Sequence, residues 1–152
     1  MPTNFLWGTR QSATSLLTTE LNSLATANGS AASGAIDLTA SGWILGDLEL
    51  YVASSSLAFT AASYVDVYFL TSSDGTNYPK YTSGASYKIA QNYWAARIWI
   101  HPATLSSEAI YESVREVRIP SAKFKAVLVS GLGVTLPASG NTLKLYPTPE
   151  QY

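Results

Sequence analysis

Beyond residue 42, apolar and polar residues alternate along the chain in short runs. In DLELYV, Asp47 and Glu49 alternate with leucines, and in VDVYF three apolar residues share one face. A period of two is typical of strands with one buried face. About seven or eight short strands with turn residues between them predict an all-β fold, an antiparallel β-sandwich or jelly roll. Further candidate strands are 87–90, 95–101, 114–119, 124–130 and 142–146.

The first 42 residues have a different pattern, because they are rich in Ser, Thr, Ala, Gly and Asn and carry few charges. Leu17, Leu21 and Leu24 recur at spacings of four and three, which predicts a short helix with one apolar stripe. An Asn-Gly pair then ends this helix. The predicted organisation is an extended N-terminal arm with a short helix over 1–42 and a β-sandwich (jelly-roll) domain over 43–152.

The stretch YVDVYFLTSSDGTNYP poses a choice between a working loop and a simple connection. Asp74-Gly75 supplies the positive φ that a tight turn needs, and Asn77 and Pro79 close the loop. A calcium loop of the EF-hand kind needs more oxygen ligands and a closing glutamate. We therefore expect a connection between strands, with no metal bound.

The composition narrows the possible partners. Charged residues make up 12% of the 152-residue chain, and the net charge is −1, whereas an ordinary soluble domain is about 25% charged. Such a surface is suited to being covered by partners, and it lacks the basic excess that nucleic-acid binding requires. The absence of cysteine excludes disulfides and thiol chemistry. No apolar run has membrane-spanning length, so we expect a soluble protein made in the cytoplasm.

The residues provide little for catalysis. Asp47 and Glu49 share a strand face at a separation that suits a glycosidase pair, but the same pattern is common on solvated strand faces. His101 is the only histidine, and it precedes a proline at a strand end. No GxSxG elbow and no phosphate-binding glycine motif is present. We expect a protein that is not an enzyme and that uses no cofactor or catalytic metal.

Aromatic residues leave a sugar-binding alternative open. Sugar-binding sandwiches stack sugars on exposed aromatic rings. The residues with that potential are Trp94, Trp99, Tyr93, Tyr78 and Tyr81. Aromatic residues are also ordinary core and cross-strand partners in a sandwich, and we favour that interpretation.

The most charged part of the chain is YESVREVRIPSAKFK. It carries Arg115, Arg118, Lys123 and Lys125 among glutamates, on what we interpret as a strand pair. On so neutral a protein, these residues are the candidates for directional salt bridges to a partner.

Three segments of the sequence resemble small virion proteins of tailed bacteriophages, of the jelly-roll cement or decoration type. They are LWGTRQSATSLLTTELNSLA, VYFLTSSDGTNY and IPSAKFKAVLVSGLGVTLPASGNTLKLYP. The resemblance implies a structural virion protein on the capsid surface, assembled in the host cytoplasm, that oligomerises as a homodimer or homotrimer and binds the major capsid protein. The alternative is a carbohydrate-binding module associated with a phage tail or fibre.

The N-terminal arm contains a candidate anchor for the capsid or for a neighbouring copy. Phe5, Leu6 and Trp7 form a compact apolar group close to Arg10. Buried interface aromatics often contribute on the order of 2 kcal/mol each. The other interpretation is that the arm packs on its own domain, as terminal segments often do.

Overall fold

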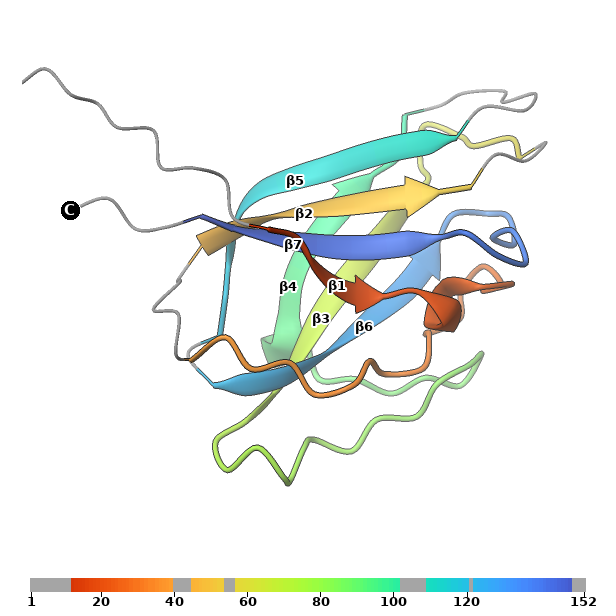
Figure 1. Cartoon of the computed structure of the whole chain (residues 1–152). Helices are drawn as coiled ribbons and strands as arrows, with labels where there is room; N and C mark the ends of the chain where they lie inside the picture. Colours follow the sequence, from red (N-terminus) through yellow and green to blue (C-terminus); the bar gives the residue numbers. More distant parts are fainter. Residues whose placement is uncertain (1–11, 40–44, 54–56, 102–108, 121, 149–152) are drawn as a thin grey trace, which may run out of the picture.

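The computed structural model of the chain describes residues 12–39, 45–53, 57–101, 109–120 and 122–148. These residues form seven strands arranged as two antiparallel sheets that face each other (Figure 1). The all-β sandwich predicted from the sequence is therefore confirmed.

One sheet has four strands and the other has three. The first has the order β1 (Thr14–Leu17), β7 (Thr142–Thr148), β2 (Leu45–Val52) and β5 (Ile110–Arg118). The second has the order β4 (Trp94–Trp99), β3 (Tyr64–Ser72) and β6 (Lys123–Gly131). Two short 3-10 helices, η1 (Thr19–Leu21) and η3 (Gln91–Tyr93), precede β2 and β4.

The core lies between the sheets and is built from alternate residues of each strand. Phe69 of β3 and Phe124 of β6 stack with ring centroids 4.7 Å apart. Burial of each large apolar side chain contributes about 1.5–3 kcal/mol, which is why period-two strands fold face to face. Fully buried members include Leu48, Leu50, Val65, Val67, Leu128, Leu143 and Leu145.

The predicted strand at 87–90 does not form a strand in the structure. It belongs to the long connection 73–93, which begins with the SSDGTNYP loop and leads to β4. Residues of this connection, among them Tyr87 and Ile89, pack on Tyr68 and Leu70 at the outer face of the three-stranded sheet. The apolar residues that suggested a strand are therefore used to cover a face of the sheet instead of pairing with a neighbour.

The short helix expected around the leucines of the N-terminal segment is not the structure that forms there. Thr14–Leu17 is strand β1, paired with β7, and only the single turn η1 is helical. Leu17, Leu21 and Leu24 are all buried in the core. The surrounding threonines and serines have weak helix propensity, and pairing with β7 satisfies the backbone instead.

Residues 28–36, here called the serine strap, run along the outer edge of β6 (orange in Figure 1). At its two ends the pairing is between backbones: the amide of Ser130 donates to the carbonyl of Asn28 (2.9 Å), and Phe124 and Ile36 exchange two bonds (2.8 and 3.0 Å). The edge that β6 would otherwise present to solvent is closed by this pairing.

The middle of the serine strap uses side chains in place of backbone carbonyls. The backbone amides of Ser30 and Ser33 donate to the carbonyls of Leu128 and Ala126. Three residues of the strap therefore lie alongside every two residues of β6. Because of this mismatch, the strap carbonyls do not lie opposite the amides of Ala126 and Leu128. The Ser33 hydroxyl accepts from the Ala126 amide at 2.8 Å, and the Ser30 hydroxyl accepts from the Leu128 amide at 3.1 Å.

Candidate functional site

The outer face of β3 and β4 carries a cluster, here called the β4 patch, made of an exposed Trp99 and a half-buried Tyr64 and Arg97. The antiparallel register places Tyr64 opposite Trp99. Their ring centroids lie 5.5 Å apart at 63°, and the Arg97 guanidinium lies 3.8 Å from the Tyr64 centroid and 5.3 Å from that of Trp99. Trp99 remains 55% exposed. Most of an indole is thus available for contact.

Asp66 holds the β4 patch in place from beneath. Its carboxylate is buried and accepts two bonds from Arg97, at 2.8 and 2.7 Å, in the fork geometry that is typical of strong Arg–carboxylate pairs. These hydrogen bonds raise the pKa of Arg97, so its charge is retained at every physiological pH. The indole N–H of Trp94 donates to the same carboxylate at 3.2 Å. Asp66 therefore fixes the side chains of Arg97 and Trp94 through contacts within the chain.

Close packing under Tyr64 depends on a glycine. A Cβ at Gly131 would lie 2.6 Å from the Tyr64 ring, because this residue of β6 faces the ring directly. The absence of a side chain lets the tyrosine lie flat over β6.

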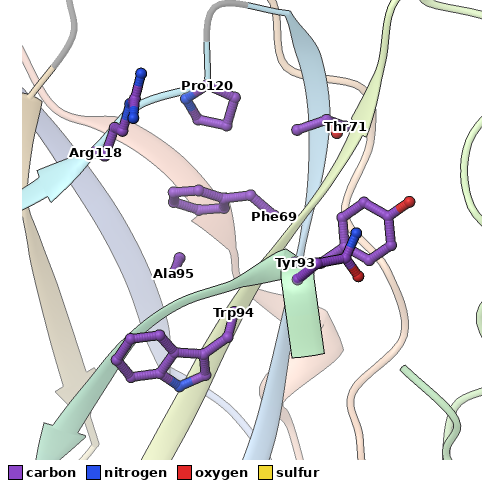
Figure 2. Close-up of a pocket in the computed structure, with 8 residues that line it drawn as sticks. Phe69, Thr71, Tyr93, Trp94, Ala95, Arg118 and Pro120 are labelled. Atoms are coloured by element: carbon purple, nitrogen blue, oxygen red, sulfur yellow. The ribbon is translucent and has the colours of Figure 1, made fainter. Parts of the chain in front are cut away.

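A second feature is a pocket of about 290 Å³ that Trp94 helps to line (Figure 2). Its residues come from β3, from η3 and the start of β4, and from the end of β5. They are Phe69, Thr71, Asn92, Tyr93, Trp94, Ala95, Arg118 and Pro120.

The four basic residues predicted to bind a partner do not form one surface. Arg115 and Arg118 are exposed on β5, in the four-stranded sheet, whereas Lys123 and Lys125 lie on β6 in the other sheet. The strands β5 and β6 do not pair with each other, so the expected strand pair is not present. Arg118 lines the pocket beside Trp94, and the other three basic residues do not line that pocket.

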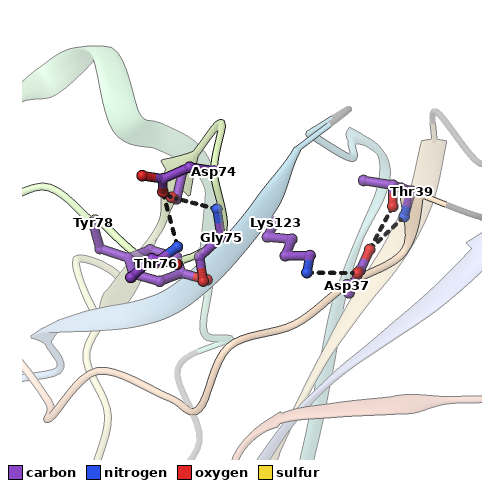
Figure 3. Close-up of polar contacts among 8 residues, drawn as sticks. Asp37, Thr39, Asp74, Gly75, Thr76, Tyr78 and Lys123 are labelled. Atoms are coloured by element: carbon purple, nitrogen blue, oxygen red, sulfur yellow. Dashed lines mark hydrogen bonds and ion pairs between the residues drawn. The ribbon is translucent and has the colours of Figure 1, made fainter.

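The two lysines already have partners within the chain. Lys123 forms an ion pair with Asp37 at 3.3 Å (Figure 3), and Lys125 lies over the Tyr78 ring at 4.7 Å. Hydrogen bonds from Thr39, together with Lys123, lower the pKa of Asp37. Both lysines thus tie adjacent loops to β6. The predicted anchor residues Phe5, Leu6, Trp7 and Arg10 lie outside the described residues.

The SSDGTNYP loop is organised by Asp74 (Figure 3). One carboxylate oxygen accepts from the Ser72 hydroxyl and from the Thr76 and Asn77 amides, each at 2.8 Å. The other oxygen accepts from the Asn77 side chain at 2.7 Å. These bonds lower the pKa of Asp74 far below its usual range. Gly75 has φ +71°, the positive value predicted for it, so the residues of this loop build a turn.

The carboxylates and the histidine considered for catalysis have structural contacts. Asp47 accepts from the Glu116 amide at 3.2 Å, and Glu49 accepts from the Tyr146 hydroxyl at 3.2 Å. His101 lies 2.8 Å from the carboxylate of Glu112. Within the described ranges, no three His, Cys, Asp or Glu residues form a group able to hold a metal, and no helix there is long and apolar enough to cross a membrane.

The residues missed from the sequence are Tyr64, Asp66 and Arg97. Two of them have a local signal, since Asp66 interrupts an apolar strand and Arg97 lies between two tryptophans. To predict that Asp66 contacts Arg97, one must know the register of β3 against β4, and the 73–93 connection that separates these strands does not reveal it. Of the aromatics considered for sugar binding, Trp94 and Trp99 are exposed, whereas Tyr81 is bonded to the Ser30 carbonyl at 2.7 Å.

Comparison with known proteins identifies no relative of this chain. No protein-family model matches the sequence, and neither a curated protein nor a solved structure shows significant similarity to the chain. The functional argument therefore depends on the residues and their geometry.

Proposed function

We propose that this chain is a non-enzymatic structural virion protein, a capsid cement or decoration protein that oligomerises and binds the major capsid protein. The observation that carries the proposal is the β4 patch. Tyr, Trp and Arg are the residues most enriched at the energetic centres of protein interfaces. Here an exposed Trp99 lies beside a half-buried Tyr64 and Arg97 on one sheet face. Asp66 holds Arg97 in place, which reduces the entropy that binding would cost.

The fold supports the proposal if it is taken as a jelly roll. With the serine strap counted as an eighth strand, the second sheet has the order strap, β6, β3, β4, opposite β1, β7, β2, β5. In this arrangement the first strand lies beside the last, and two sheets of four strands face each other, as in the two Greek keys of a jelly roll. Viral capsid proteins commonly use this fold. The resemblance of the sequence to decoration proteins implies that the partner is the major capsid protein.

The N-terminal residues give the proposal a second contact. Phe5, Leu6 and Trp7 are the apolar anchor that would staple the protein to the capsid or to a neighbouring copy. Residues 14–24 are tied into the sandwich by β1 and by the core leucines. An anchor at residues 5–7 would therefore be joined to the β-sandwich through strand β1, which is held in place by its pairing with β7.

The test is co-sedimentation with capsids assembled without this chain, from the phage that encodes it. We expect Trp99→Ala to weaken binding by about thirtyfold, because an interface hot spot contributes about 2 kcal/mol or more. Tyr111→Ala is the matched control, since Tyr111 is 68% exposed on the four-stranded sheet, away from the β4 patch. Equal effects of the two substitutions would overturn the assignment of the patch.

Two further measurements complete the test. A variant lacking residues 1–11 should fold and bind capsids less tightly if the anchor acts as a staple. Sedimentation equilibrium should give a dimer or trimer, and a 16.3 kDa species at all concentrations would contradict self-association.

A second candidate function is a carbohydrate-binding module of a phage tail or fibre. It is favoured by the exposure of both Trp94 (48%) and Trp99 (55%) on one strand. Binding to bacterial surface polysaccharide, together with recovery of the chain in tails and not in heads, would select this function.

A further inference from the structure

The pocket beside Trp94 has the composition of a small ligand site. Phe69 is almost fully buried and forms its floor, with Ala95 beside it. Trp94, Tyr93 and Pro120 line the pocket around this apolar floor (Figure 2). A volume of about 290 Å³ suits one ring-sized group. The pocket therefore offers stacking surfaces to a compact ligand.

The Trp94 ring is fixed in position without help from a ligand. Its indole N–H is committed to the buried Asp66 carboxylate at 3.2 Å, and yet the side chain is 48% exposed. Its remaining exposed surface is largely the apolar carbon surface of the ring. A ring held this way is suited to stacking against C–H groups and not to donating a hydrogen bond.

The polar side chains of the pocket can donate hydrogen bonds, and one of them is positively charged with no acidic residue in the lining. Arg118 is exposed at the end of β5, and its side chain forms no ion pair or hydrogen bond with any part of the chain that the structure describes. Asn92 and Thr71 add an amide and a hydroxyl, and none of the eight lining residues is acidic. The charge of the pocket therefore complements an anionic ligand.

We propose that this pocket binds one acidic sugar residue of a polysaccharide, with its carboxylate on Arg118 and the C–H face of its ring on Trp94. A guanidinium binds a carboxylate through two parallel hydrogen bonds, and Asn92 and Thr71 are available for the ring hydroxyls. The proposal goes beyond the capsid role and does not depend on it, because no residue of the β4 patch lines the pocket.

A sugar fits these groups better than an acidic peptide does. A carboxylate on a peptide side chain presents little apolar surface of its own, so it would leave the aromatic wall uncovered. A pyranose carries a carboxylate, hydroxyls and an apolar C–H face on one ring, and those three features match Arg118, Asn92 and Trp94. The acidic peptide is therefore a comparison ligand in the test.

The test titrates the full chain with short oligosaccharides that contain glucuronate or galacturonate, followed by calorimetry and by ¹H–¹⁵N spectra. The four tryptophans give four indole N–H signals, and Trp94→Phe assigns the one of interest. We expect the Trp94 signal to shift on binding and the Trp99 signal to remain in place. Binding should weaken as salt is raised, because the contact is between charges.

Matched variants locate the site. Arg118→Gln and Trp94→Ala should each weaken binding by about tenfold or more, whereas Arg115→Gln and Trp99→Ala should leave it unchanged. Arg115 is an equally exposed arginine of the same strand, and Trp99 is an exposed tryptophan of β4; neither lines this pocket. Circular dichroism shows whether each variant is folded, and Trp94→Phe replaces Trp94→Ala if the latter is not.

Three outcomes would overturn the proposal. The first is equal binding of a neutral glucose oligomer that Arg118→Gln does not alter. The second is a glutamate hexapeptide that binds with the same dependence on Trp94 and Arg118 while the acidic sugars do not bind. The third is no binding of any acidic sugar. Capsid co-sedimentation of Arg118→Gln, expected to be normal, separates a failure here from a failure of the capsid proposal.

Discussion

Replacing the strap serines with alanine should destabilise the sandwich through its backbone. Ser30 and Ser33 are 1% and 5% exposed. Their hydroxyls are the acceptors for the buried amides of Leu128 and Ala126, at 3.1 and 2.8 Å. Alanine removes one oxygen from each residue and changes nothing else in the covalent structure. Each substitution thus leaves one amide of β6 without its acceptor.

The magnitude follows from the cost of an unpaired buried donor. An amide deprived of its partner loses about 1–3 kcal/mol of stability, more than the net value of an ordinary hydrogen bond. We expect each of Ser30→Ala and Ser33→Ala to lower the free energy of unfolding within that range. The double variant should lose about 2–5 kcal/mol, and its value need not equal the sum, since the two residues lie on one short segment.

Ser130 provides a matched control on the same strand. Its hydroxyl is buried, and it is the one buried side-chain polar atom in the described ranges that has no hydrogen-bond partner. Ser130→Ala makes the same chemical change and breaks no hydrogen bond. We expect a change near zero or a small gain of up to about 1 kcal/mol, because an unsatisfied buried hydroxyl is itself unfavourable.

The assay is urea unfolding combined with amide exchange. The three variants should share the wild-type m-value, which shows that the same surface is exposed on unfolding. In Ser33→Ala the Ala126 amide should exchange faster than the amides of β6 that face β3. If Ser30→Ala and Ser130→Ala change stability equally, the hydroxyls of the strap do not replace backbone acceptors.

Three further predictions test the core, the β4 patch and the loop. Leu21→Ala should lower stability by about 2–5 kcal/mol and Leu45→Ala, at a residue that is 38% exposed, by about 1 kcal/mol or less; similar calorimetric values would contradict the packing of Leu21 into the core. Gly131→Ala should displace Tyr64, whose ring lies 2.6 Å from the added Cβ, and weaken capsid binding in co-sedimentation more than Gly34→Ala, which has open space. Because folding lowers the pKa of Asp74, its contribution is complete above the ordinary value of about 4 and is lost as pH falls through the lower folded value. The Thr76 and Asn77 amide signals should titrate at that lower pH, and a midpoint near 4 would refute the hydrogen-bond network.

The strands were predictable from the sequence because their inward-facing apolar residues recur with a period of two. In β2 this alternation is a local property, so the pattern alone gives the element and its inward face. In β3 the inward residues alternate in the same way, but the outward residues are buried too, beneath the 73–93 connection. The serine strap was not predictable in this way. Its small polar residues have the same composition as a flexible linker, and their partners on β6 lie 93 and 98 residues further along the chain.

The candidate site was predictable only in part. The sequence indicates that Asp66 lies on the outer face of its strand and that Trp94 and Trp99 have the potential to stack a ligand. The Asp66–Arg97 pair joins residues 31 positions apart, and the intervening connection gives no sign of the register. Trp94 and Arg118 line one pocket although their strands, β4 and β5, belong to different sheets. No local sequence pattern predicts that these two strands pack beside each other.

The two edges of the three-stranded sheet differ in how their backbone groups are paired. The serine strap satisfies the outward amides and carbonyls of β6 at four positions, whereas β4 pairs with β3 on one side only among the described strands. An unpaired edge strand is an aggregation hazard unless charge, bulges or a partner protects it, and the one charged residue of β4 is Arg97. Under our proposals a partner protects this edge, where the β4 patch and the proposed sugar pocket both lie. Substitutions on the β4 side should therefore alter binding before they alter stability, and substitutions in the strap should do the reverse.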